Sequence, residues 1–440
     1  GLSEELLNVL AKIRGLRVAS RTSAFFFKGK DVDIPTVAQK LNVATVLEGS
    51  VRKSGKRVRI TAQLIQVATY SHLWSETYDR ELDDIFAVQD DIAQSVVKEL
   101  RAALLGEGIG ATADAQAKAD VQAAATGRAT DPEAHRLYLQ GRYFIERMTG
   151  EDVARGSAYF REAIAIDPDF ALAHAGLSRA CSLQAGQGWD SVAGGYEKAR
   201  AAAQRALALA PDLPEGYVCL GAVLEAHDWD WKAANAAYER AFALAPGNVD
   251  VLRAVAGIRR LYDADAALEL LRRAAALDPL STSTLRQLGM RCLHSGRVDE
   301  AWKSLNTALD LNPKAGLVHC MLAATRLTQG FPAEALALAE REVIGDFRLL
   351  RVSLAEHALG HTDAADKALT QLIDEYGGVA AYQIALAYAL RGDADNAFGW
   401  LERAYDQRDP GMTNLVCDRF LATLRDDPRW PPLMRKMGFA

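Results

Sequence analysis

A proline-bounded unit of helical character recurs along most of this chain, and it constrains the fold more than any other feature. The clearest copy runs between Pro279 and Pro313, which stand 34 residues apart. Small residues at Gly289 and Ala301 allow two helical segments to approach closely, and Ser295-Gly296 interrupts the helical pattern between them. One such hairpin cannot bury its own apolar face, so each copy requires neighbours on both sides. The sequence therefore predicts a stack of helical hairpins.

This pattern resembles the tetratricopeptide repeat (TPR), a helical hairpin of about 34 residues that ends in a proline. We expect a TPR array of about eight hairpins over residues 131–410, marked by Pro168, Pro211, Pro246, Pro279, Pro313, Ala335, Leu354 and Pro410. Residues 411–440 are expected to form capping helices, because a solenoid end needs a polar outer face. Residues 106–130 are rich in alanine and glycine without an apolar period, which indicates a flexible linker.

Residues 1–105 have the pattern of a small α/β domain. Val43–Arg52 and Arg57–Val67 flank a Lys53–Lys56 turn, and the second segment alternates apolar with polar residues. That alternation predicts a β-hairpin with one buried face. Further strands are expected at Leu16–Ser20 and Leu73–Tyr78, and helices at Pro35–Leu41 and Ile85–Leu100. The predicted fold class is mainly α, a TPR solenoid preceded by this domain.

Residues 1–30 (GLSEELLNVLAKIRGLRVASRTSAFFFKGK) and 41–97 (LNVATVLEGSVRKSGKRV onward) resemble the TolB amino-terminal-like, or FlgO-like, domain. The resemblance implies a place between an N-terminal effector and C-terminal TPRs. The effector is commonly a class III adenylate or guanylate cyclase domain, or a winged-helix DNA-binding domain. Family members have a β-strand ahead of the first helix, whereas this chain starts at Gly1. We therefore expect a fragment without that strand or its effector, with an exposed sheet edge.

The TPR resemblance also implies which side chains face a ligand on the concave side of the array. These positions are Arg179, Asp250, Arg253, Arg260, Arg286, Met290, His294, Leu327 and Tyr382. Arginines from adjacent repeats suit a peptide carboxylate, because a guanidinium pairs with it bidentately. The alternative is that these arginines are solvated or paired within the array, since Asp263 and Asp265 also lie nearby.

A second candidate surface is the basic tip of the predicted hairpin, which comprises Arg52, Lys53, Lys56 and Arg57. It could contact a phosphate or an acidic partner. The alternative is a solvated hairpin whose charges deter edge-to-edge association.

Motifs for catalysis or cofactor binding are missing from the sequence: it has no Walker loop, HExxH, GxSxG or kinase signature. We expect no catalytic residues, metal or cofactor. The net charge of −6 argues against nucleic-acid binding, and no apolar run reaches the length of about 18–20 residues that spans a bilayer. Five cysteines without a CxxC pair favour reduced thiols, and hence the cytoplasm. A transmembrane helix upstream of Gly1 would instead indicate the periplasm.

These observations predict a non-catalytic protein–protein interaction and regulatory module of a bacterial signalling protein. Its partner, a peptide or protein, would bind in the concave groove of the TPR array. Two alternatives remain open: the regulatory C-terminal region of an adenylate or guanylate cyclase, and a periplasmic or envelope-associated scaffold. The sequence leaves homo-oligomerisation open.

Overall fold

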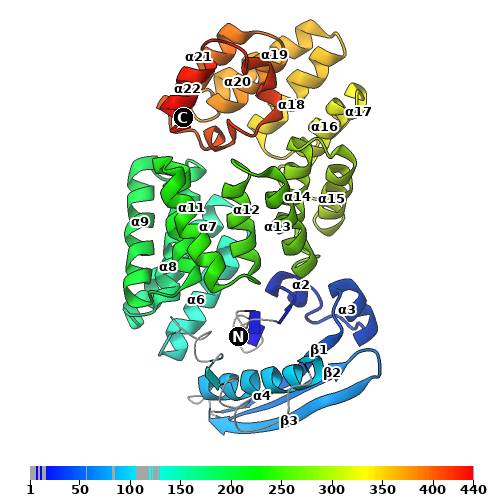
Figure 1. Cartoon of the computed structure of the whole chain (residues 1–440), viewed down its shortest axis with the longest axis vertical. Coiled ribbons are helices and arrows are strands. Elements are labelled where there is room, and N and C mark those ends of the chain that lie inside the picture. The colour runs from blue at the N-terminus through cyan, green and yellow to red at the C-terminus, as the bar shows by residue number, and fades with distance from the viewer. Residues whose placement is uncertain are drawn as a thin grey trace.

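The computed structural model shows a mainly α solenoid preceded by a small α/β domain (Figure 1). It describes residues 6–7, 10–11, 16–55, 57–81, 85–105, 118–119, 121, 127 and 129–439. Most of the linker predicted at 106–130 therefore lies outside the described residues.

The α/β domain is built on a three-stranded antiparallel sheet with strand order β1-β2-β3. The elements are β1 (Thr45–Ser54), β2 (Arg57–Gln66), β3 (Ser71–Glu81) and α4 (Ile85–Leu105). The predicted alternation in β2 is confirmed, because Val58, Ile60 and Leu64 are each at most 2% exposed. They share a core with Val88 and Ile92 of α4, and Figure 1 shows α4 across one face of the sheet.

Two short helices lie between the sheet and the solenoid: α2 (Arg21–Phe25) and α3 (Ile34–Leu41). The helix predicted at Pro35–Leu41 is confirmed, with Asp33 accepting a hydrogen bond from the backbone of its first turn. The strand predicted at Leu16–Ser20 is wrong, since these residues have no regular structure. The backbone N–H of Ser20 donates instead to the Leu277 carbonyl of the solenoid, at 2.8 Å.

Eight consecutive helix pairs form the solenoid in the described part of the chain. They are α6 (Pro132–Ile145) and α7 (Gly150–Ile166), α8 (Ala171–Gly186) and α9 (Val192–Leu209), α10 (Pro214–Val223) and α11 (Trp231–Leu244), α12 (Val249–Arg259) and α13 (Ala264–Leu277), α14 (Thr282–His294) and α15 (Val298–Leu311), α16 (Val318–Thr328) and α17 (Pro332–Ala339), α18 (Gly345–Ala358) and α19 (Thr362–Tyr376), α20 (Ala381–Leu390) and α21 (Ala394–Asp406). A π-helical turn, η2 (Leu224–Asp228), joins α10 to α11.

Glycines on the first helices allow the paired helices to pack closely. A Cβ added at Gly141, Gly221 or Gly289 would lie 2.6 Å from a side-chain carbon of the second helix. The facing residues are Phe160, Tyr238 and Leu305. Only glycine fits at these positions without moving the large side chain opposite.

The last residues, 410–439, are called the C-terminal segment below. They contain two 3-10 turns, η3 (Pro410–Asn414) and η4 (Arg419–Leu424), and one short helix, α22 (Trp430–Lys436). The prediction of capping helices over 411–440 therefore needs correction, because α22 is the only α-helix among the described residues of the segment. The segment also returns to the third helix pair, where the Trp231 indole donates to the Met437 carbonyl and stacks on Phe439.

Replacing Gly289 with tryptophan tests this packing. The new side chain has no free volume against Leu305, so we expect a loss of about 1–3 kcal/mol or more in the free energy of unfolding, measured by urea denaturation. Gly399→Ala is the matched control, because its added Cβ meets nothing within 4 Å. It should stabilise α21 by roughly 0.5–1 kcal/mol through helix propensity. A Gly289→Trp variant as stable as wild type would contradict the assigned helix contact.

Candidate functional site

Four of the predicted ligand-contacting residues lie on the first helices of the second, fourth and fifth pairs. Arg179 lies on α8, Arg253 on α12, and Arg286 and Met290 on α14. We call these four residues the arginine face. Burial lowers the pKa of Arg286, and repulsion from Arg253 adds to the effect. The two guanidinium groups are therefore near enough to repel each other. Arg179 repels Arg253 in the same way.

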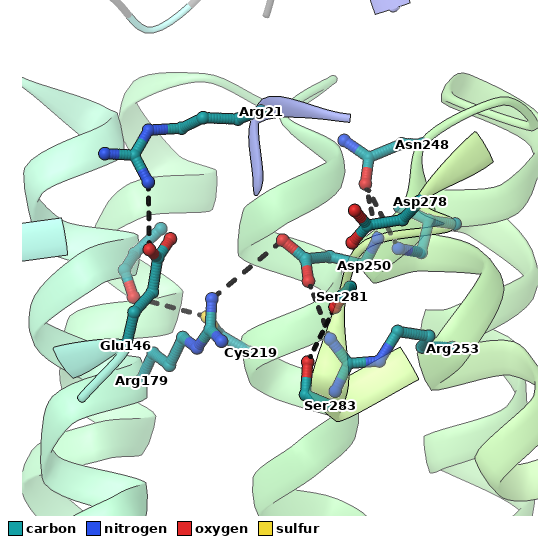
Figure 2. Close-up of polar contacts among 12 residues, drawn as sticks. Arg21, Glu146, Arg179, Cys219, Asn248, Asp250, Arg253, Asp278, Ser281 and Ser283 are labelled. Atoms are coloured by element: carbon teal, nitrogen blue, oxygen red, sulfur yellow. Dashed lines mark hydrogen bonds and ion pairs between the residues drawn. The ribbon is translucent and has the colours of Figure 1, made fainter. Parts of the chain in front are cut away.

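Asp250 is the carboxylate that lies among these arginines. Its Oδ2 is 3.9 Å from Nη1 of Arg179, and its Oδ1 is 3.5 Å from Nη1 of Arg253 (Figure 2). Burial opposes ionisation of this carboxyl, but Arg179 and Arg253 outweigh it and lower the pKa of Asp250. Both contacts are long for ion pairs, which leaves the arginines incompletely neutralised.

Arg286 carries a positive charge that the array does not pair. It forms no hydrogen bond or close ion pair with any residue in the described ranges, although it is partly buried and the buried carboxylate of Glu342 attracts it from farther away. Arg253 also has a neutral partner, because its Nε donates to Oε1 of Gln287 at 3.0 Å. The alternative that these arginines pair within the array therefore holds in part for Arg179 and Arg253 and fails for Arg286.

Arg260 has a different environment, because it is only 9% exposed and is hydrogen-bonded to the C-terminal segment. Its Nη1 pairs with Oε1 of Glu225 at 3.0 Å, and its Nη2 donates to the Thr413 carbonyl at 2.8 Å. Glu225 also accepts a hydrogen bond from the Tyr238 hydroxyl at 2.9 Å. Nε of Arg260 is buried and has no hydrogen-bond partner among the described residues.

Arg291 on α14 makes a second attachment to the same segment. It is 6% exposed, and its Nη2 donates to Oδ1 of Asn414 at 3.2 Å. Its Nη1 donates to Sγ of Cys417 at 3.4 Å. In the other direction, Arg419 of the segment donates to the Leu293 carbonyl at 3.2 Å. The C-terminal segment is thus hydrogen-bonded to both α14 and the end of α12.

This docking covers three more of the predicted contact residues, whereas Leu327 packs partly buried in the core of the array. Arg260 lies beneath the segment as described above. His294 packs edge-on against Phe420 of η4 with ring centroids 6.0 Å apart, and burial lowers its pKa to about 4. Tyr382 is 4% exposed, and its hydroxyl donates to Asp418 at 3.0 Å. The C-terminal segment therefore contacts these three residues, and only Arg260 shares a pocket with Arg253 and Met290 of the arginine face.

A pocket of about 240 Å³ lies between α12, α14 and η3. Its polar lining residues are Glu225, Arg253, Arg260, Gln287, Arg291 and Asn414. The sequence-based prediction included only Arg253 and Arg260 of these. Arg291 could have been found from its place inside the apolar run Leu288–Leu293, where a charged residue is unusual. Asn414 had no local signal.

The second candidate surface, the basic hairpin, keeps most of its charges exposed. Arg57 and Arg59 both pair with Asp79 of β3, at 2.9 and 2.8 Å. Arg52 and Lys53 lie at the exposed end of β1, and Lys56 lies outside the described residues. Ion pairs this exposed contribute little to stability.

Contacts from α2 attach the α/β domain beside the arginine face. Nη1 of Arg21 pairs with Glu146 of the solenoid at 2.8 Å (Figure 2). The Ser23 hydroxyl donates to Oδ1 of Asp278 at 2.7 Å and accepts from the Leu280 N–H at 2.9 Å. The domain thus contacts the solenoid at two separate helix pairs.

No protein-family model matches the chain. One curated relative is a protein named putative adenylate cyclase 3, from Rhizobium meliloti (strain 1021). It is 39% identical over 178 residues, which cover 40% of this chain and 28% of the relative. The chain therefore matches little more than a quarter of that protein's length.

Several solved TPR structures have a related arrangement of helices. One from a functional characterisation of Pseudomonas aeruginosa pilF is 21% identical, covers 46% of this chain and 93% of its own, and has a TM-score of 0.36. A thermophilic TPR protein of Thermus thermophilus is 18% identical, with coverages of 44% and 99% and a TM-score of 0.37. Since these scores are below 0.5, the TPR assignment rests on the helix pairs themselves. In the ranges that the structure describes, no helix is long and apolar enough to cross a membrane.

The ion pair between Arg260 and Glu225 gives a direct test of this site. Replacing Glu225 with leucine leaves a buried guanidinium without its carboxylate, which should cost about 3–5 kcal/mol in the free energy of unfolding. The double variant Glu225→Leu with Arg260→Met removes both charges and should recover much of that loss. Urea denaturation of the three proteins checks this. Equal stability of wild type and Glu225→Leu would show that the pair is not buried as described.

Proposed function

We propose that this chain is a non-catalytic interaction module that holds a partner peptide or protein on the arginine face. The observation that carries the proposal is the unpaired charge of Arg286, next to Arg253 and Arg179, which share one carboxylate. Partly buried cations that are incompletely neutralised are costly, and an acidic partner would supply further carboxylates. Met290 adds an apolar contact beside them.

The proposal extends to regulation of a cyclase in a longer bacterial protein. The match to the putative adenylate cyclase supports it, because 178 residues of that protein resemble this chain at 39% identity. The resemblance of residues 1–30 and 41–97 to the TolB amino-terminal-like domain is consistent with it. In this proposal the catalytic groups belong to another domain, and the present chain binds the regulatory partner.

We also propose a reducing compartment, the cytoplasm, for this module. All five cysteines are free thiols, and four of them are buried: Cys181, Cys219, Cys292 and Cys320. Burial raises the pKa of Cys219 to about 11, so this thiol stays protonated and unreactive at neutral pH.

Charge reversal at two positions of the arginine face tests the proposed binding. Arg253→Glu with Arg286→Glu should weaken binding of a fluorescein-labelled acidic hexapeptide with a free carboxyl terminus by roughly tenfold or more, measured by fluorescence anisotropy. The variant should stay folded, although Arg253→Glu replaces the contact with Asp250 by a repulsion between two carboxylates. A thermal melt of each variant checks that it is folded.

The matched control reverses two exposed arginines on second helices, Arg205→Glu on α9 and Arg240→Glu on α11. It changes the net charge by the same amount and should leave binding within about twofold, because exposed charges act weakly at physiological salt. Equal weakening by both double variants, or none by either, would contradict a specific acidic ligand on the arginine face.

A further inference from the structure

The pocket between α12, α14 and η3 lies where the repeat helices meet the C-terminal segment. Its volume of about 240 Å³ is below the range of roughly 300–1,000 Å³ that holds drug-sized ligands. It therefore suits one small chemical group. The third, fourth and fifth helix pairs and the C-terminal segment all contribute to its wall.

The charges of the lining are unbalanced. It carries three arginines, Arg253, Arg260 and Arg291, against one glutamate, Glu225, an excess of two positive charges. Glu225 contacts Arg260 at 3.0 Å, and the carboxylate nearest Arg253 is Asp250 at 3.5 Å. Among the described residues Arg291 forms no ion pair.

Hydrogen-bond donors in the pocket are also left unused. Nε of Arg260 is buried and donates to no described residue. Arg291 is 6% exposed, yet its partners are an amide oxygen of Asn414 and the sulfur of Cys417. Burial lowers the pKa of Arg291, and repulsion from Arg260 adds to the effect, while Asp418 opposes it without forming an ion pair. A neutral oxygen and a thiol are weak acceptors for a buried guanidinium.

We propose that this pocket binds a dianionic group with dicarboxylate or phosphate chemistry, held by Arg253, Arg260 and Arg291. Two negative charges would balance the excess of the lining, and two or more oxygens would accept the unused N–H groups. The group could be a free small anion or the side chain of a bound acidic peptide. The second case rests on the proposed function, because the pocket shares Arg253 with the arginine face.

The sharpest test supplies a carboxylate from the chain itself. In Asn414→Asp a carboxylate oxygen takes the place of the amide oxygen that lies 3.2 Å from Nη2 of Arg291. We expect a higher melting temperature and at least tenfold weaker binding of succinate and inorganic phosphate. Both anions are titrated by calorimetry and by thermal shift, against sodium chloride of equal ionic strength. A lower melting temperature, together with no effect of either anion beyond chloride, would overturn the proposal.

A second variant keeps the test valid if Asn414→Asp disturbs the segment. Arg253→Gln removes one lining charge from a side chain that is still 25% exposed. It should weaken succinate and phosphate binding severalfold while the protein stays folded. Arg240→Gln on the outer helix α11 is the matched control and should leave binding unchanged. Equal loss in both variants would mean that the anions bind by general charge attraction, which contradicts a built site.

The acidic hexapeptide distinguishes the two sources of the group. If succinate or phosphate binds and Asn414→Asp abolishes this, the ligand is a free small anion. If only the peptide binds and Asn414→Asp weakens it, the group belongs to the partner. Suppose that the Arg253→Glu, Arg286→Glu variant loses peptide binding while Asn414→Asp leaves it unchanged. This result would refute the pocket as a binding site and leave the proposed function standing. Binding of the small anions without any peptide binding would support the pocket and refute the proposed function.

Discussion

The hydrogen bonds of two buried arginines attach the C-terminal segment to the repeat helices. Arg260 and Arg291 reach from α12 and α14 to the C-terminal segment, to Thr413, Asn414 and Cys417. A buried guanidinium is stable only with partners for its donors, so the segment and the arginines need each other. The segment in turn covers His294 and completes the pocket. The arrangement of the candidate site therefore depends on this docking.

The repeat supplies the rest of the site. Arg253 and Arg286 are 33 residues apart in sequence, close to one repeat, so stacking of helix pairs places them side by side on α12 and α14. Close packing at Gly289 against Leu305 fixes the pairing of α14 with α15 within that stack. Because like charges are brought together in this way, the arginine face keeps an excess positive charge. An acidic ligand is the simplest group that would neutralise it.

Features with a local signal were predictable from the sequence, and those made by distant contacts were not. The alternation of β2 identified the sheet, and the recurring prolines with small residues such as Gly289 identified the helix pairs. The Leu16–Ser20 strand failed because Ser20 bonds to Leu277, far away in the chain. For the same reason, the TPR resemblance placed Tyr382 among the ligand contacts, whereas the structure buries it with its hydroxyl bonded to Asp418 of the returning segment.

Native-state hydrogen exchange of residues 410–424 tests the docking most directly. Two short 3-10 turns have few internal hydrogen bonds and exchange rapidly unless they are packed against the rest of the protein. With Arg260 and Arg291 holding them, their hydrogen-bonded amides should be protected to nearly the same degree as those of α14. Exchange of residues 410–424 at the rate of an unfolded peptide, while α14 stays protected, would contradict the account.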